Sequence, residues 1–209
     1  GTLADTSVLT VLPHDVASVT VTPEAVSLLP LDSLSLSTVL RAADLTVLAD
    51  RSVAYTSVDP AVASVTAAGR LRAEDYTGPL TRTTRILATS GGVTDTVPVE
   101  VLPIPVARVV ATPEAVTLFP GDTLTVTRRA ESASGRLLTD RATAWLSSDT
   151  AIVRLDTQGR ITIAPYAGTE TRVVSVVVFS EARADTVPVT VAPLVPASVT
   201  LAPDSLIMR

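Results

Sequence analysis

A 90-residue internal repeat constrains the fold of this chain more than any other feature. The segment "TPEAV" at residues 22–26 returns at 112–116, and "DTVPV" at 95–99 returns at 185–189. Both pairs keep one offset, since 112 − 22 = 90 and 185 − 95 = 90. Residues 16–105 align without a gap on residues 106–195, with about 34 of the 90 positions identical. A self-similar sequence with a fixed period indicates tandem copies of one domain.

The two ends of the chain continue the same period. "DTSVLTVLP" at 5–13 falls one period before residues 95–103, and "ASVTLAPDSL" at 197–206 falls one period after residues 107–116. We therefore expect residues 1–15 to be the last strand of a preceding repeat and residues 196–209 to be the first strand of a following one. The complete repeats are 16–105 and 106–195. Neighbouring repeats, or a strand from an adjacent chain, would complete the terminal strands.

The composition favours strands over helices. The chain has 32 valines and 31 threonines in 209 residues, and β-branched side chains fit a pleated sheet better than a helix. No window shows sustained apolar residues at helical spacing, and no apolar run approaches the 18 residues of a membrane span. The chain has no cysteine, so disulfides are excluded. Its net charge of −5 argues against nucleic acid as a partner, because a phosphate backbone requires a basic face.

Turn residues divide each repeat into short strands with partial alternation of apolar and polar residues. "FPGD" at 119–122 and "TQG" at 157–159 are predicted turns, and Gly159 is expected at positive φ. Many short strands without a helix predict an all-β fold, here tandem antiparallel β-sandwiches. In the second repeat we expect strands near 107–112, 115–119, 123–130, 141–147, 151–155, 160–164, 171–180 and 185–192.

The motifs of both repeats resemble the bacterial immunoglobulin-like domain, group 2. The second repeat carries "VARVVATPEAVTLFPGDTLTV", then "AWLSSDTAIVRLDTQGRI", then "DTVPVTV". The first repeat matches through "VASVTVTPEAVSLLPLDSLSL" and "AYTSVDPAVASVTAAGRL", with Tyr55 in place of the tryptophan and Leu31 in place of the turn glycine. The resemblance implies immunoglobulin-like sandwiches in an exported bacterial protein, such as a stalk, an adhesin or an accessory module of a secreted enzyme.

The aromatic residues have structural and functional interpretations. Trp145 is the only tryptophan, and Tyr55 takes its place one period earlier, so we favour a core position over an exposed ligand platform. Tyr76 and Tyr166 each stand two residues before a glycine, where sandwiches often place a tyrosine hydroxyl against the backbone. Gly69 and Gly159 are assigned to turns. A structural role is expected for all six residues.

No constellation of reactive residues is recognised. His14 is the only histidine and lies in "PHDV" between two repeats; a triad with Asp15 and a serine lacks any surrounding motif. Asp59 and Asp149 follow serine-containing turns, where capping of backbone N–H groups is the favoured role. Zinc would require His or Cys clusters, and only Asp15 offers a carboxylate for calcium at a junction. We therefore expect no catalytic residue, no metal and no cofactor.

The junctions between repeats are short and rich in proline. "LPIPV" at 102–106 contains Pro103 and Pro105, and "APLVP" at 192–196 contains Pro193 and Pro196. Proline fixes φ, so these residues are predicted to be short, stiff linkers.

These observations favour a non-enzymatic stalk or fibre-forming segment of an extracellular bacterial surface protein, with neighbouring repeats of the same or an adjacent chain as partners. The alternative is an adhesin module that binds a glycan or a host protein through its loops. Residues 41–50 and 131–140 are the places to look, since they differ strongly between the repeats.

Overall fold

The computed structural model describes residues 14–195, 198 and 200, and these residues contain strands and turns but no helix. The expectation of an all-β fold is therefore confirmed. The described residues divide into two compact units on either side of the bond between Ile104 and Pro105. Most residues of the strands expected within 1–15 and 196–209 fall outside the described residues, namely 1–13, 196–197, 199 and 201–209.

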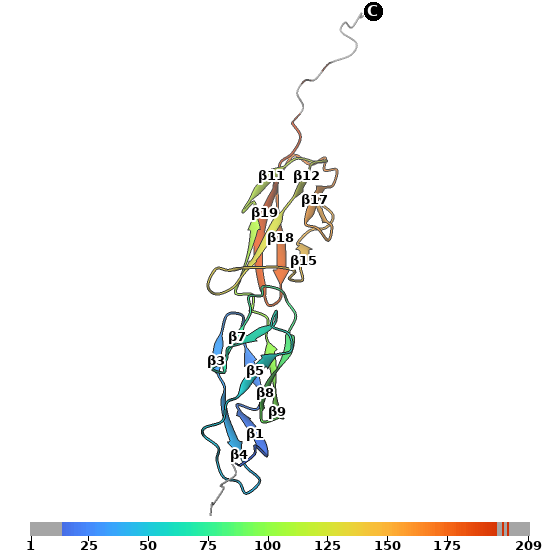
Figure 1. Cartoon of the computed structure of the whole chain (residues 1–209). Helices are drawn as coiled ribbons and strands as arrows, with labels where there is room; N and C mark the ends of the chain where they lie inside the picture. Colours follow the sequence, from blue (N-terminus) through green and yellow to red (C-terminus); the bar gives the residue numbers. More distant parts are fainter. Residues whose placement is uncertain (1–13, 196–197, 199, 201–209) are drawn as a thin grey trace, which may run out of the picture. The chain divides into compact units, whose positions relative to one another are not determined.

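The first unit is a sandwich of two layers. One layer is a four-stranded sheet in the order β2-β9-β8-β5, and the other combines β1 and β4 with the sheet β3-β7-β6 (Figure 1). The chain joins the two parts of the second layer at Leu36, a buried residue between β3 and β4. The strands are β1 (Ser18–Thr22), β2 (Val26–Leu28), β3 (Ser33–Ser35), β4 (Ser37–Arg41), β5 (Ala54–Ser57), β6 (Ala63–Val65), β7 (Arg70–Ala73), β8 (Arg82–Ser90) and β9 (Val93–Val101).

The second unit repeats this topology. Its four-stranded sheet has the order β11-β19-β18-β15, and its other layer holds β10-β13-β14 and β12-β17-β16. The short strand β14 has no named equivalent in the first unit, where a single bridge between Arg41 and Val47 takes its place. The strands are β10 (Arg108–Thr112), β11 (Val116–Leu118), β12 (Thr123–Thr125), β13 (Thr127–Glu131), β14 (Leu137–Leu138), β15 (Ala144–Ser147), β16 (Val153–Leu155), β17 (Arg160–Ile163), β18 (Arg172–Ser180) and β19 (Arg183–Val191).

The "TPEAV" segments change layer. In the first unit β1 pairs with β4 in one layer, and three residues later β2 pairs with β9 in the other. The pairing of β2 with β9 is parallel, from Val26 opposite Val99 to Leu28 opposite Val101. Pro98 stands just before this paired stretch, where a residue without an N–H is tolerated in a strand. The second unit repeats this with β11 and β19.

Aliphatic side chains fill both sandwiches. Along β9, Val97, Val99 and Val101 are each about 1% exposed and alternate with outward residues, as a period of two requires. Removing such a side chain from water stabilises the fold by about 1.5–3 kcal/mol. The apolar run of β18 lies in a central strand, because β18 is paired with β15 on one side and with β19 on the other (Figure 1).

The first and last strands of each unit are joined by an aspartate from "DTVPV". Asp95 Oδ2 accepts a hydrogen bond from the backbone N–H of Val21 at 2.8 Å, and Asp185 Oδ2 accepts one from Ala111 at 2.8 Å. The donor and the acceptor belong to different layers of the sandwich. The same bond in both units explains why "DTVPV" keeps its aspartate.

Three predicted strands differ in detail from those observed. The strand expected at 123–130 is interrupted at Val126, whose N–H donates to the carbonyl of Gly159 and whose side chain is buried. The strand expected at 141–147 begins only at Ala144, and the one expected at 151–155 begins at Val153. In the last case Asp149 accepts the N–H of Ala151 in a tight turn, which delays the strand.

Candidate functional site

Trp145 lies half-buried in β15 and packs against a turn glycine. A Cβ placed on Gly159 would lie 2.5 Å from Trp145 Cζ2 and 2.7 Å from the Val126 carbonyl oxygen. Gly159 also has φ of 78°, a conformation that side chains disfavour. The indole therefore occupies the space that any side chain at this turn would need.

Tyr55 occupies the corresponding place in the first unit. It is half-buried against the core, and its ring lies 3.0 Å from where a Cβ of Gly69 would stand. Its hydroxyl is 2.7 Å from Thr38 Oγ1, within hydrogen-bond distance. The phenol thus reaches a partner that the indole of Trp145 does not have, because Arg128 stands where the first unit has Thr38.

A shallow hollow of about 270 Å³ opens beside Trp145. Arg128, which lines this hollow, already has a hydrogen-bond partner, since its guanidinium donates to the backbone carbonyl of Arg141 at 2.7 Å. An aromatic surface edged by hydroxyl and amide groups is the chemistry that suits a polar ligand with apolar patches, such as a sugar. The lining residues are Thr125, Val126, Thr127, Arg128, Thr143, Trp145, Thr157 and Gln158.

Tyr76 and Tyr166 fold back over glycines at the corner that leads into the long central strands. A Cβ on Gly78 or Gly168 would collide with the hydroxyl of the tyrosine two residues earlier. The hydroxyl of Tyr76 accepts the backbone N–H of Leu80 at 3.3 Å. Both rings are half-buried.

An arginine covers each corner tyrosine. The guanidinium carbon of Arg82 lies 5.4 Å from the centre of the Tyr76 ring, and that of Arg172 lies 6.0 Å from the Tyr166 ring. Arg172 Nε also donates to the Tyr166 hydroxyl at 3.4 Å, and this bond raises the pKa of the Arg172 guanidinium above its usual value. Cation–π stacking of this kind fixes side chains at a surface and contributes modestly to stability.

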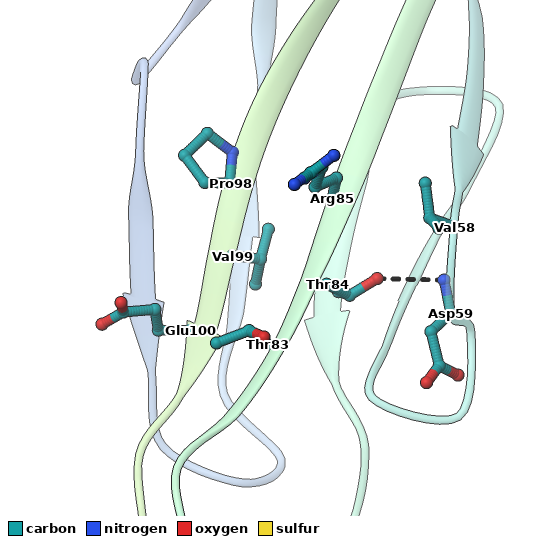
Figure 2. Close-up of a pocket in the computed structure, with 8 residues that line it drawn as sticks. All are labelled: Val58, Asp59, Thr83, Thr84, Arg85, Pro98, Val99 and Glu100. Carbon is teal, nitrogen blue, oxygen red and sulfur yellow. Dashed lines mark hydrogen bonds between the residues drawn. The ribbon is translucent and has the colours of Figure 1, made fainter.

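A second hollow, of about 380 Å³, lies on the first unit beside β8 and β9. Figure 2 shows Thr84 Oγ1 accepting the backbone N–H of Asp59, at 2.9 Å, while the Asp59 carboxylate points elsewhere. That carboxylate accepts the N–H of Ala61 at 3.0 Å. Asp149 makes the equivalent bond to Ala151 at 3.0 Å, so the predicted capping role of both aspartates is confirmed. The lining residues are Val58, Asp59, Thr83, Thr84, Arg85, Pro98, Val99 and Glu100.

His14 is exposed at the start of the described chain. Its Nδ1 lies 3.7 Å from Asp44 Oδ1, and its backbone carbonyl accepts a bond from Arg51. The pKa of the Asp44 carboxyl is lowered, chiefly by hydrogen bonds from Thr46 and further by the charge of His14. The hydroxyl of Ser90, in the same hollow, donates to the carbonyl of Ser52. His14 and Ser90 therefore each have partners other than one another.

The linker prolines lie outside the strands. Pro103 and Pro105 stand between β9 and β10, and Pro193 follows β19. Pro196 lies outside the described residues. Within residues 14–195, no three His, Cys, Asp or Glu side chains gather closely enough to hold a metal ion. No helix long and apolar enough to span a membrane occurs in the described chain.

An ion pair that sequence reasoning missed joins the turn between β18 and β19 to the segment before β15. Arg141 Nη1 lies 2.7 Å from Glu181 Oε1, and the Arg141 side chain is only 2% exposed. Glu181 stands in the turn between β18 and β19 with φ of 52°. Its other oxygen accepts the backbone N–H of Val106 at 3.1 Å. The carboxylate thus ties the β18–β19 turn to two distant segments.

Comparison with known sequences identifies the domain type. The family model of the bacterial Ig-like domain (group 2) matches residues 15–101. No curated protein matches the sequence.

Solved structures that are similar to the chain include a surface-layer protein, an adhesin and a cadherin. The S-layer protein SbsC is 18% identical, with a TM-score of 0.41 over 88% of this chain and 29% of that chain. The adhesin InvE of Yersinia pseudotuberculosis is 15% identical, with a TM-score of 0.41 over 83% of this chain and 58% of that one. Mouse cadherin-23 is 13% identical, with a TM-score of 0.42 over 87% of this chain and 67% of that one. The chain spans less than a third of the SbsC chain.

Proposed function

Since residues 15–101 form a bacterial Ig-like domain of group 2, we propose that the chain is a structural, non-enzymatic segment of an extracellular bacterial surface protein. In this role the tandem domains form a stalk or a filament-forming region that supports adhesion or builds the cell surface. Their partners are the neighbouring Ig-like repeats of the same or an adjacent chain.

The observation that carries this proposal is the repetition of structural bonds in the two units. The cross-layer bond of Asp95 recurs at Asp185 with the same length of 2.8 Å. The turn of Asp59 recurs at Asp149 with bonds of 3.0 Å. The two repeats thus share the hydrogen bonds that stabilise the sandwich. This is the pattern expected when the role of the chain is to form a folded segment of fixed length.

Exchange of repeats tests this role. Residues 106–195 of the intact surface protein are replaced by a second copy of residues 16–105, which keeps the 90-residue period. Immunolabelling of whole cells, before and after treatment with protease, measures exposure on the surface. A structural segment keeps its surface exposure and its support of adhesion after the exchange. Labelling that requires lysis of the cells, in the unmodified protein, contradicts an extracellular role.

A binding module is the second candidate, and the hollow beside Trp145 is the observation that favours it. This hollow combines an aromatic side chain with threonines and Gln158, and the first unit has alanine at the place of that glutamine. A glycan array probed with the whole chain, and with Trp145→Tyr as the matched variant taken from the first repeat, tests it. Binding that is lost in Trp145→Tyr supports the module, and an array without hits removes it.

A further inference from the structure

The outward face of the sheet β3-β7-β6 in the first unit carries two arginines in a polar hollow. Along β7, Arg70 and Arg72 are exposed, whereas Leu71 and Ala73 are fully buried. Because successive side chains of a strand point to opposite faces, both arginines lie on the outer surface of the sandwich. The hollow has a volume of about 470 Å³, larger than the two hollows described above. Its lining residues, named here the arginine hollow, are Leu31, Ser33, Ser64, Thr66, Arg70 and Arg72.

The strand register surrounds Arg72 with hydroxyl groups. Ser33 of β3 lies opposite Arg72 on one side, and Ser64 of β6 lies opposite it on the other. Side chains directly opposite on one face stand about 4.5–5.5 Å apart at their Cβ atoms. Ser33 also accepts a hydrogen bond from Arg70 Nη2 at 3.0 Å. Ser33 therefore neighbours both arginines, since it binds Arg70 and lies across from Arg72.

The positive charge of the arginine hollow is not neutralised by the described chain. Within residues 14–195, neither Arg70 nor Arg72 forms an ion pair with a carboxylate, and the Arg72 guanidinium has no hydrogen-bond partner. Glu74, which follows β7, instead accepts the hydroxyl of Ser64 at 2.6 Å, so this carboxylate already has a partner. Two unneutralised positive charges in one hollow are contrary to the net charge of −5 of the whole chain.

The second unit provides an internal comparison, because it has the same strands in the same order. At the position of Arg72 it has threonine, and at the position of Thr66 it has Asp156. There Asp156 accepts the backbone N–H of Arg160 at 2.9 Å, the same turn bond that Thr66 makes with Arg70 at 3.1 Å. The fold therefore accepts a carboxylate at this turn, and the first unit has a neutral hydroxyl there. The six equivalent residues of the second unit are Gly121, Thr123, Arg154, Asp156, Arg160 and Thr162.

We propose that the arginine hollow binds a sulfate or phosphate ester carried by a polysaccharide. Both esters present the oxygen atoms of a tetrahedral anion, and the forked N–H donors of a guanidinium match such oxygens in charge and geometry. Arg72 supplies the unpartnered donors, and Arg70 adds a second positive charge on the same face. This inference goes beyond the proposed structural function, from which it takes only the extracellular setting, and the structural function stands without it.

The remaining lining residues favour an ester that is attached to a sugar. Hydroxyl groups both donate and accept hydrogen bonds, so Ser33, Ser64 and Thr66 suit the hydroxyl groups of a sugar. Leu31, which is 46% exposed, offers a small apolar surface to the C–H groups of a sugar ring. The lining contains no aromatic side chain on which a nucleic-acid base would stack. The chemistry of the hollow therefore suits a charged polysaccharide better than a single-stranded nucleic acid.

A polymer supplies the affinity that one exposed hollow lacks. Both arginines are exposed, and a single exposed ion pair contributes little to binding. We therefore expect a Kd on the order of 10 mM for inorganic sulfate or phosphate. A polysaccharide repeats its ester groups, so chains held side by side at a surface engage one polymer at several points. For immobilised chains we expect an apparent Kd for the polymer that is lower by at least about 100-fold.

Surface plasmon resonance with the whole chain immobilised tests the proposal. The probes are dextran sulfate and dextran phosphate, which distinguish the two esters, and uncharged dextran of the same length is the reference. The variants Arg72→Thr and Thr66→Asp each introduce the residue of the second repeat, which already occupies that position in a folded unit. We expect binding of the charged dextran to weaken at least about tenfold in each, because the first loses a guanidinium and the second gains a repelling carboxylate.

A matched pair of double variants separates the hollow from the charge of the whole chain. Arg70→Gln/Arg72→Gln and Arg154→Gln/Arg160→Gln both change the net charge from −5 to −7, since −5 − 2 = −7. We expect the first to weaken binding at least about tenfold and the second less than about twofold. Circular dichroism and calorimetry verify that each variant is folded. Trp145→Tyr is expected to leave this binding unchanged, which distinguishes the arginine hollow from the hollow beside Trp145.

Nuclear magnetic resonance of the parent chain provides a second measurement that does not depend on weakening the hollow. The Nε–Hε signal of Arg72 is assigned by its loss in Arg72→Thr and is followed during titration with inorganic sulfate or phosphate. We expect this signal and the amide signals of Ser33 and Ser64 to shift and saturate together. The Nε–Hε signal of Arg154, on the equivalent sheet of the second unit, should shift much less at the same ion concentration.

Several outcomes overturn the inference. They are no binding of either charged dextran, undiminished binding in folded Arg70→Gln/Arg72→Gln, and equal weakening in the double variant of the second unit. Poly-glutamate or single-stranded DNA that binds as tightly as the charged dextrans would also overturn it, because the ester on a sugar would then not be the feature recognised. None of these results changes the immunolabelling of whole cells, so failure of this site is distinguishable from failure of the structural role.

Discussion

The ion pair between Arg141 and Glu181 should make the second repeat strongly dependent on one carboxylate. In Glu181→Ala the guanidinium of Arg141, with its side chain 2% exposed, loses the partner that lies 2.7 Å away. The N–H of Val106 loses its acceptor at the same time. Both losses fall on groups that water reaches poorly, and removing one partner of a buried ion pair is strongly destabilising.

The expected loss of unfolding free energy is about 2–3 kcal/mol. A hydrogen bond to a charged group contributes about 1.5–3 kcal/mol and a neutral one about 1 kcal/mol. The upper end is reduced because the Glu181 side chain is 38% exposed, so water partly replaces it in the variant. In Glu181→Gly the loss should be smaller by about 1 kcal/mol, since glycine tolerates the φ of 52° at this position.

Fluorescence of Trp145 measures this change in the second repeat alone, because it is the only tryptophan. We expect the urea midpoint to fall by about 1–2 M in Glu181→Ala. Arg141→Met removes the charge instead, and in the double variant with Glu181→Ala most of the loss should be recovered. In the first repeat, Arg51 stands at the position of Arg141, and Gly91 takes the place of Glu181. Arg51→Ala is therefore the matched control. It should change the unfolding free energy of the first repeat, measured by calorimetry, by less than about 0.5 kcal/mol. A midpoint shift below about 0.3 M, or additive losses in the double variant, would refute the reasoning.

Three further predictions concern single residues. Gly159→Ala should destabilise the second repeat by about 2–4 kcal/mol, because its Cβ would meet the indole of Trp145 at an unfavourable φ; urea unfolding followed by fluorescence checks this, and an unchanged midpoint contradicts it. Leu31→Gly should stabilise the first repeat by about 0.5–1 kcal/mol, since Leu31 has φ of 74°; a lower calorimetric midpoint would count against it. Asp185→Ala removes the acceptor of the Ala111 N–H and should destabilise the second repeat by about 1–2 kcal/mol; protection of that amide against hydrogen exchange should fall, and unchanged protection argues against the bond.

Features set by neighbouring residues could be predicted from the sequence. The nearly continuous apolar run within 171–180 indicated the strand observed as β18 (Arg172–Ser180), and the serine-aspartate sequence indicated the turn at Asp149. The group 2 Ig-like type also followed from local motifs, and the family match at residues 15–101 confirms it. The strand and the turn depend on backbone preferences within a few residues, whereas the domain type was recognised from its resemblance to a known family.

Features set by distant residues could not be predicted. Arg141 and Glu181 are 40 residues apart, and Asp185 is 74 residues from Ala111; nothing local indicates either pair. Trp145 was expected in the core and is half-buried over Gly159.

The parallel pairing of β2 with β9 also determines how a domain responds to tension. When a domain in a tandem array is pulled from both ends, force enters near β1 and β2 and leaves through β9. Because β2 and β9 run in the same direction, the two strands are loaded in shear, and their hydrogen bonds must break together rather than one after another. The bond from Asp95 to Val21 fastens β1 to the same strand. The resistance of each domain to extension is therefore concentrated in a few bonds between its first and last strands.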